Sequence, residues 1–487
     1  MSNGLGTRAV RGSLWLGVVN LVSKSSQMLV TLVLAALLSE GELGVVALAV
    51  SLVNLGQVVQ SIGVYDVISR TEQDPRRMAG TVLTMSVGAG VLLAAILALA
   101  ADPISTALGA PGAAGLVRLA ALSLPFSAAG GVQMGLLHRD LDFRRRMLPD
   151  GGGAVLGAVV TVVLALSGAG PTSLVVGLLC TAVAQPVFGT LVGAGIRPRW
   201  HRGAAREAVR WIAVVGPAAV VAALLVNLDY LAIGHVLGTD AVGVYSLAYR
   251  LAWVPYIMVA VVLGAVAFPV FTRMVRAGRS GELPAVLGKF TRAALVVTGG
   301  LYVSLAVLSD RVVVLGERWA PAAGPLVLLS GYGLGVCLLQ IWYQAVKATG
   351  HVRLYLALET THLTVLVLSL VLLTRFGVEA VAAAQLAAAW VLVPVTWWAL
   401  ARLTVAPALK ELAGVAVKVL AAAAAGAVPA VALDRAGVFG ATGSLPGALA
   451  EVAVLVLGYA GATLLAQRGA LGELKTLRQQ EELGADR

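Results

Sequence analysis

Long apolar runs dominate this sequence and restrict what the chain can fold into. About fourteen of them have roughly 20 residues each, the length of a helix that crosses about 30 Å of hydrocarbon. They are rich in Leu, Ala and Val and lack the polar–apolar alternation of a membrane β-barrel. The runs are 14 to 37, 43 to 64, 80 to 101, 113 to 136, 149 to 168, 173 to 196, 211 to 235, 241 to 267, 293 to 314, 321 to 345, 354 to 373, 378 to 400, 414 to 433 and 446 to 466. The sequence therefore predicts an all-α polytopic membrane protein with about fourteen transmembrane helices.

The composition agrees with a membrane protein and argues against a soluble enzyme. Hydrophobic residues make up 59% of the chain and charged residues 12%, whereas soluble domains are about 25% charged. The net charge of +11 is distributed between apolar runs, so no nucleic-acid partner is expected. The sequence has no G-x-x-x-x-G-K-[ST] or H-E-x-x-H motif, and Cys180 and Cys337 fall inside apolar runs. We expect no cofactor, no metal site, and a transporter rather than an enzyme.

Basic residues in the connections predict the orientation of the chain. Most of the 35 Lys and Arg residues fall in alternate connections, which assigns those connections and both termini to the cytoplasmic side. The opposite side has Arg311, Arg318, Arg375 and Arg435, interspersed with acidic residues. The longest cytoplasmic connection, 272 to 292, is expected to lie on the membrane surface as an amphipathic segment.

An internal repeat predicts how the helices are grouped. Residues 42 to 49 read ELGVVALA, and residues 241 to 248 read AVGVYSLA. The second segment lies six predicted helices further along the chain than the first, and an even offset gives lobes of the same orientation, related by an axis along the membrane normal. We assign helices one to six to an N-terminal lobe (1–200), helices seven to twelve to a C-terminal lobe (201–405), and two appended helices with a tail to 406–487. Such lobes suit alternating access.

Three basic residues inside the runs are candidates for substrate binding. Lys24 lies about ten residues into the first helix, roughly 15 Å deep at 1.5 Å per residue, and Arg250 lies at a similar depth from the other side. A base at the bilayer centre costs at least about 2.5 to 3.5 kcal/mol, so each should face a wet cavity or a partner. Arg118 lies nearer the outer end of its helix, where its side chain can reach the interface.

Acidic residues inside the runs are candidates for ion coupling. Asp229 lies about six residues from the outer end of its helix, at a depth within about 5 Å of Arg250. Two interpretations remain open: an ion pair with Arg250, or a site for a proton or Na⁺ with Asn227 as an extra oxygen ligand. Glu359 begins another helix near the inner interface and is a weaker candidate for the same role.

Three stretches resemble a known family. They are RGSLWLGVVN, LAALLSEGELGVVALAVSLVNLGQVVQSIGVYDVISR and LDYLAIGHVLGTDAVGVYSLAYRLAWVPYIMVAVVLGAVAFPVFTRM. They are similar to the Wzx-type, WzxC-like polysaccharide branch of the multidrug/oligosaccharidyl-lipid/polysaccharide exporter superfamily. The resemblance covers both predicted lobes. It implies a flippase of the bacterial inner membrane that moves polyprenyl-pyrophosphate-linked oligosaccharide to the outer leaflet, with a cationic lumen and an ion gradient rather than ATP as the energy source.

The resemblance gives the candidate residues a role. Lys24 and Arg250 are suited to an anionic pyrophosphate headgroup. Tyr249 and Trp253 belong to a row of aromatic residues spaced by three or four positions, which either stacks against sugar or packs against neighbouring helices. The implied partners are the lipid-linked oligosaccharide, membrane lipids, H⁺ or Na⁺, and a polysaccharide polymerase or glycosyltransferases, with the chain itself monomeric.

Other functions remain as alternatives. A cation-coupled multidrug exporter of the same superfamily should have an acidic or apolar cavity, which Lys24 and Arg250 do not favour. A membrane glycosyltransferase or polysaccharide polymerase needs an acidic catalytic loop or a sizeable outer domain, and the short outer connections count against both. A scramblase or a structural assembly partner stays possible because no residue pattern proves ion coupling.

Overall fold

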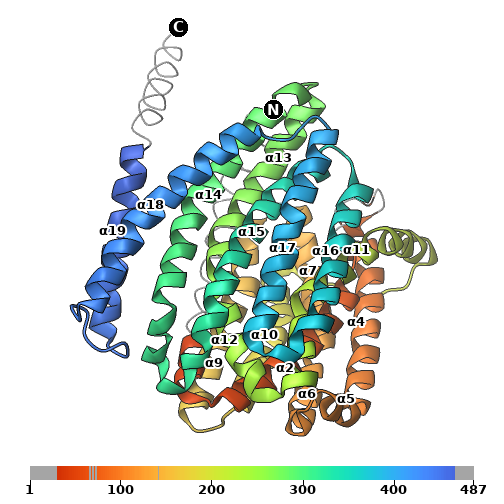
Figure 1. Ribbon diagram of the computed structural model, residues 1–487. Coiled ribbons are helices and arrows are strands. Elements are labelled where there is room, and N and C mark those ends of the chain that lie inside the picture. Colours follow the sequence, from red (N-terminus) through yellow and green to blue (C-terminus); the bar gives the residue numbers. More distant parts are fainter. Residues whose placement is uncertain (1–29, 65–66, 69–70, 72–73, 141, 467–487) are drawn as a thin grey trace. The chain divides into compact units, whose positions relative to one another are not determined.

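The computed structural model of the protein describes residues 30–64, 67–68, 71, 74–140 and 142–466 (Figure 1). Thirteen helices of this part are long and apolar enough to cross a membrane, and it has no β-strand. The all-α prediction is therefore confirmed, and the protein is a multi-pass membrane protein. Of the predicted runs, 14 to 37 lies mostly outside the described residues.

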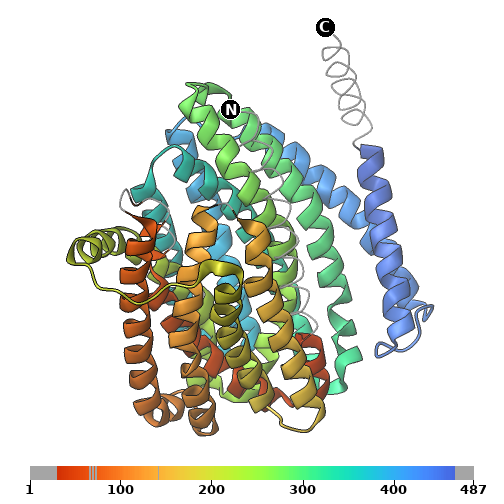
Figure 2. The same ribbon diagram turned by 180° about the vertical axis from the view of Figure 1, so that it is seen from behind.

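One compact unit contains the described residues up to Arg250 together with Leu356–Ala388. Its helices are α2 (Glu40–Ser61), α4 (Pro75–Leu99), α5 (Ala101–Ala107), α6 (Ala114–Ala121), α7 (Ser123–Arg139), α8 (Phe143–Met147), α9 (Gly153–Leu166), α10 (Thr172–Gly189), α11 (Arg202–Leu237), most of α12 (Thr239–Pro255), most of α16 (Val352–Leu373) and the first part of α17 (Val378–Arg402). α9 and α10 run beside each other, as Figure 2 shows. The repeated sequence segments both lie in this unit, at the starts of α2 and α12.

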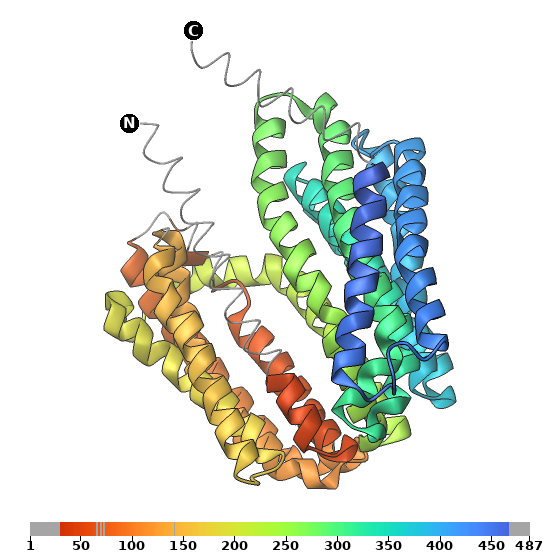
Figure 3. The ribbon, with the colours of Figure 1, turned by 90° about the vertical axis from the view of Figure 1, so that its left-hand side faces the viewer.

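The second compact unit contains Leu251–Tyr355 and the described residues from Ala389 onward. Its complete α-helices are α13 (Val262–Arg276), α14 (Leu283–Val307), α15 (Ala323–Ala348), α18 (Leu409–Arg435) and α19 (Leu445–Ala466), and the π-helical segment η4 (Tyr256–Val261) precedes α13. α14 packs against both α15 and α18, and α18 runs beside α19 (Figure 3).

A buried arginine joins the last two helices to the rest of this second unit. Arg311, in the 3-10 segment after α14, donates to Glu451 at 2.7 Å, to Asp434 at 2.5 Å and to the Ala441 carbonyl at 3.0 Å. Removing one partner of a buried pair leaves an uncompensated charge and costs about 3–5 kcal/mol. The network therefore attaches α18 and α19 to the segment that follows α14. The sequence predicted these two helices as an appended pair.

The prediction of a surface segment at 272 to 292 is wrong. α13 continues to Arg276 and α14 begins at Leu283. Most basic residues of this region therefore lie within the ends of these two helices. Gly278, with φ 73°, makes the turn between them. Arg279 then binds Glu282 through two hydrogen bonds of 2.8 and 2.6 Å across the intervening 3-10 turn.

Local sequence explains where α2 and α4 begin. The Ser39 Oγ accepts a hydrogen bond from the Glu42 N–H at 3.3 Å, and the Ser39 N–H donates to the Glu42 carboxylate at 2.9 Å. This reciprocal capping box satisfies two backbone donors that a helix start leaves without intrahelical partners. Asp74 caps α4 by accepting from the Arg76 N–H at 3.0 Å, and Pro75 follows at the first helical position.

The two repeated segments meet through equivalent glycines. A Cβ on Gly44 of α2 would overlap the carbonyl oxygen of Thr239, and a Cβ on Gly243 of α12 would overlap that of Glu40. Each glycine thus faces the carbonyl that lies four residues before the other glycine. This reciprocity fits a two-fold relation between the repeats, and it lets two helix starts approach at backbone distance. The lobe boundaries themselves stay a prediction.

We expect Gly44→Ala to lower the melting temperature of the purified protein, because the added methyl group forces two backbones apart at a typical cost of about 1–3 kcal/mol. Gly88→Ala in α4 is the matched control, since nothing lies within 4 Å of its added methyl group. Alanine is also the better helix former by about 0.8–1 kcal/mol, so the control should melt at the same temperature or higher. Equal melting temperatures for both variants would contradict the close glycine contact.

Candidate functional site

A buried carboxylate in α11 is the centre of the candidate site. Asp229 is 0% exposed. The Tyr245 hydroxyl of α12 donates to its Oδ2 at 2.6 Å, and the Gln385 amide of α17 donates to the same oxygen at 3.0 Å. The Tyr230 N–H donates to Oδ1 at 2.9 Å. Three helices thus converge on one acid, and a carboxylate with about four acceptor positions has one acceptor position beyond these three hydrogen bonds.

The two tyrosines that contact this carboxylate belong to a cluster of three aromatic rings. The ring centroids of Tyr230 and Tyr245 lie 5.6 Å apart, edge to face, and Tyr249 lies 5.7 Å from each of them. Separations of about 4.5–7 Å are favourable for aromatic pairs. Asp229 is fully buried beside this cluster, and a low local dielectric strengthens the electrostatic interactions that a buried acid makes.

Arg250 lies one helical turn beyond Ser246 on α12, and its hydrogen-bond partners among the described residues are hydroxyl groups. Its Nε donates to the Ser246 Oγ at 3.2 Å, and its Nη1 lies 3.5 Å from the Thr31 Oγ1. Within the described part of the chain, no carboxylate lies within ion-pair distance of Arg250, Asp229 included. The ion-pair interpretation of Asp229 and Arg250 therefore has no support in the structure.

The other predicted ion-coupling residues lie apart from the Asp229 hydrogen bonds. Asn227 is buried, but its amide donates to the Ala223 carbonyl of its own helix at 2.9 Å. Residues two positions apart on a helix do not face each other, so Asn227 and Asp229 point in different directions. Glu359 is buried on α16, and His362 lies one turn further along the same helix.

Of the two other predicted basic residues, the structure places only Arg118. Lys24 lies outside the described residues. Arg118 of α6 forms an ion pair with Asp102 of α5 and donates to the Ala98 carbonyl at 3.3 Å. Its side chain is 46% exposed, which agrees with a position at the edge of the bundle.

The predicted aromatic row divides into two clusters. Tyr249 is buried with Tyr230 and Tyr245, whereas Trp253 packs on Tyr256 at 4.4 Å and on Tyr332 of α15 at 6.4 Å in the second compact unit. Both clusters contain ring contacts between neighbouring helical segments, and Trp253 retains partial exposure. A role of Tyr249 or Trp253 in sugar binding stays a prediction.

Comparison with known proteins assigns the chain to a family. A family model described as "Polysaccharide biosynthesis protein" matches residues 33–324. The chain belongs to this family. The matched part includes Asp229, Tyr245 and Arg250, whereas Gln385 lies beyond it.

Two curated relatives extend this result. The succinoglycan biosynthesis transport protein ExoT of Rhizobium meliloti (strain 1021) is 26% identical over 335 residues, which is 65% of this chain and 67% of the relative. The lipopolysaccharide biosynthesis protein WzxC of Escherichia coli (strain K12) is 23% identical over 332 residues, 67% of each chain.

Solved structures share the fold. The lipid II flippase MurJ, in an inward closed conformation, matches with a TM-score of 0.77 at 12% identity and covers 95% of this chain and 100% of its own. An inward-facing multidrug resistance MATE transporter matches with a TM-score of 0.62 at 15% identity, over 80% of this chain and 98% of its own. The predicted likeness to the multidrug/oligosaccharidyl-lipid/polysaccharide exporter superfamily is confirmed at the level of fold.

Sequence reasoning missed the partners that the fold brings to Asp229 and Arg250. Gln385 is the one amide in the alanine-rich stretch AVAAAQLAAAW, and an isolated polar residue in an apolar run is a signal for an internal partner. Its Oε1 is buried without a hydrogen-bond partner among the described residues. Thr31 and Ser246 carry no such signal, because hydroxyl side chains often bond to their own helix.

We expect the Tyr245 and Asp229 side chains to be energetically coupled in this protein. In a double-mutant cycle of Tyr245→Phe, Asp229→Asn and the double variant, the melting-temperature changes should deviate from additivity, with a coupling of about 0.5–3 kcal/mol. A second cycle, which pairs Asp229→Asn with the exposed Asp102→Asn, should be additive. Additive changes in the first cycle would show that the 2.6 Å contact contributes nothing to stability.

Proposed function

We propose that the protein is a flippase that moves polyprenyl-pyrophosphate-linked oligosaccharide from the cytoplasmic to the outer leaflet for the synthesis of cell-surface polysaccharide. The observation that carries this proposal is membership in the polysaccharide biosynthesis family, with relatives named as a transport protein and as a lipopolysaccharide biosynthesis protein. The fold shared with a lipid II flippase supports a lipid-linked cargo and transport by alternating access rather than an enzymatic reaction.

Arg250 supports an anionic cargo. An arginine within the membrane costs at least about 2.5–3.5 kcal/mol unless it finds a partner. Ser246 and Thr31 offer only neutral hydroxyl oxygens, and the described residues supply no carboxylate. A pyrophosphate provides charge and several acceptor oxygens in a geometry that guanidinium groups bind well. We therefore assign Arg250 to headgroup recognition, and Lys24 to the same role from its predicted depth.

Asp229 supports coupling to a cation. Its carboxylate accepts hydrogen bonds from neutral donors, and no balancing base lies at ion-pair distance among the described residues. The Oε1 of Gln385 belongs to the amide that contacts Asp229 and has no hydrogen-bond partner in the described part. A proton on Asp229, or Na⁺ bound between these oxygens, would neutralise the buried charge. Binding and release of that cation is our proposal for the energy source.

We also propose an orientation and partners for this protein. Both termini are placed in the cytoplasm, because the arginine-rich connections should stay on that side. We propose a monomeric transporter that receives its cargo from glycosyltransferases and delivers it to a polysaccharide polymerase.

A cation-coupled multidrug exporter is the second candidate. The fold match to MATE transporters favours it. Purified protein in proteoliposomes discriminates between the two, because an exporter would move cationic drugs and leave a lipid-linked glycan in its original leaflet.

We expect Arg250→Gln to reduce the rate at which a polyprenyl-pyrophosphate glycan crosses proteoliposome membranes by at least about tenfold, because a hydrogen bond to a charged group contributes about 1.5–3 kcal/mol. Accessibility to an impermeant glycan-modifying reagent measures the crossing. Arg250→Lys keeps the charge and should retain part of the rate. Arg435→Gln removes an exposed arginine at the end of α18 and should leave the rate unchanged. Full activity of Arg250→Gln would remove this residue from the cargo site.

We expect Asp229→Asn to change how transport depends on pH or on Na⁺, since the amide can neither take up a proton nor neutralise a cation. Crossing rates measured across a pH series, with Na⁺ or with K⁺ outside, report the dependence. Asp240→Asn alters an exposed acid at the start of α12 and serves as the control. An unchanged dependence in Asp229→Asn would leave this residue with a structural role only.

A further inference from the structure

α11 is longer than the membrane core. Its 36 residues span about 54 Å at 1.5 Å per residue, whereas roughly 20 residues cross the hydrocarbon. No charged residue occurs from Trp211 to Leu228, but Arg202, Arg206, Glu207 and Arg210 all lie in the first three turns. The core is therefore crossed by the later part of α11, and its start extends beyond the hydrocarbon to the membrane surface.

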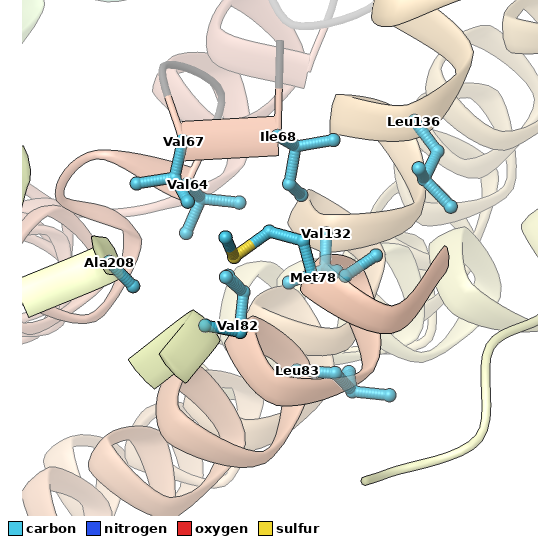
Figure 4. Close-up of a cluster of buried hydrophobic side chains, with 11 residues drawn as sticks. Val64, Val67, Ile68, Met78, Val82, Leu83, Val132, Leu136 and Ala208 are labelled. Carbon is cyan, nitrogen blue, oxygen red and sulfur yellow. The ribbon is translucent and has the colours of Figure 1, made fainter. Parts of the chain in front are cut away.

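The start of α11 is amphipathic in the structure. Ala204, Ala205 and Ala208 are buried, and they follow one another at helical spacing. Figure 4 shows Ala208 of α11 at the edge of the cluster that contains Met78 and Val82 of α4 and Val64 just after α2. Ala204 and Ala208 belong to the cluster of buried apolar side chains that contains Met78. Packing thus fixes which face of the helix points away from the protein.

A strap of residues 195–201 precedes α11 and holds its start in place. The Arg199 N–H donates to the Gly80 carbonyl at 3.1 Å, and the Thr84 hydroxyl donates to the Arg199 carbonyl at 3.1 Å. Both contacts are made to α4, whose glycine at position 80 leaves room for the strap. The strap leaves Trp200 60% exposed, immediately before the helix begins.

The outward face of the segment combines arginine with apolar residues. Arg202, Arg206 and Arg210 are exposed at successive turns, and none is in an ion pair with a described residue. Near them along the helix lie Val209, 54% exposed, and Val214, 63% exposed. A face in contact with water alone gains nothing from exposed valines, whereas a helix at a lipid interface inserts apolar side chains and binds phosphate through arginines.

We propose that residues 202 to 216 form an in-plane anchor that binds the headgroups of anionic phospholipids. The three arginines complement the negative surface potential of such a leaflet, Trp200 has the amphipathic ring typical of the interface, and the valines reach the acyl boundary. α11 continues from this anchor to Asp229 through Pro217, whose missing N–H and bulky ring allow the helix to change direction between an in-plane start and a part that crosses the core. Lipid binding at the anchor would therefore position the helix that carries the buried acid.

A fluorophore at position 209 tests this proposal in the full-length protein. Val209→Cys is labelled with bimane in a Cys180→Ala background, where Cys337 is fully buried and stays unlabelled. The protein is placed in nanodiscs of phosphatidylcholine with increasing phosphatidylglycerol. We expect a blue shift of the emission as the anionic lipid increases. Arg202→Gln/Arg206→Gln/Arg210→Gln should require at least about tenfold more phosphatidylglycerol for the same shift, or show none.

Matched variants separate this site from a general effect of charge. Arg273→Gln/Arg276→Gln/Arg292→Gln removes three exposed arginines from α13 and α14 and should leave the shift at position 209 unchanged. Replacing the three α11 arginines by lysine should preserve it. If the triple glutamine variant does not fold, Arg206→Gln alone should raise the required lipid fraction. No shift with phosphatidylglycerol, an equal shift in the α11 variant, or an equal loss in the α13/α14 variant would overturn the proposal.

Discussion

The absence of water in the hydrocarbon core is the constraint on which the rest of this structure depends. Every polar group there needs a partner within the protein, and the chain meets this need in different ways. Asp229 receives three hydrogen bonds from α11, α12 and α17. Arg311 is surrounded by two carboxylates and a carbonyl. Arg250, in contrast, has two neutral hydroxyl groups among the described residues, and this difference separates a structural arginine from one suited to an anionic ligand.

Glycine determines how closely the helices approach, because lipid chains provide no hydrophobic force that drives helices together. Gly44 and Gly243 each face a carbonyl of the other repeat, and Gly157 and Gly177 face each other's carbonyls between α9 and α10. These contacts are reciprocal, so a side chain added at either glycine of a pair would push the two helices apart. Close packing of this kind gives rigid pairs of helices, which is what alternating access by rigid-body movement requires.

Much of the fold was predictable from the sequence, because length and hydrophobicity alone identify a membrane helix. The predicted runs correspond to helices throughout the described residues, and Asp229 and Arg250 were recognised as unusual by their depth. Their partners were not predictable: Gln385 lies 156 positions from Asp229 along the chain, and only the packing of α17 brings it there. The start of α11 was missed because a hydropathy pattern ends at the first charges, although the helix itself continues. The prediction for 272 to 292 was wrong for the same reason, since most of its basic residues lie in the ends of α13 and α14.

The central claim is that this chain moves a lipid-linked glycan between leaflets. The most direct measurement is the leaflet distribution of polyprenyl-pyrophosphate oligosaccharide in cells depleted of the protein, by mass spectrometry with and without an impermeant glycan-modifying reagent. We expect the oligosaccharide to accumulate in the protected, cytoplasmic leaflet, and its mass would identify the cargo. An unchanged distribution, with the polysaccharide still reaching the cell surface, would contradict the claim.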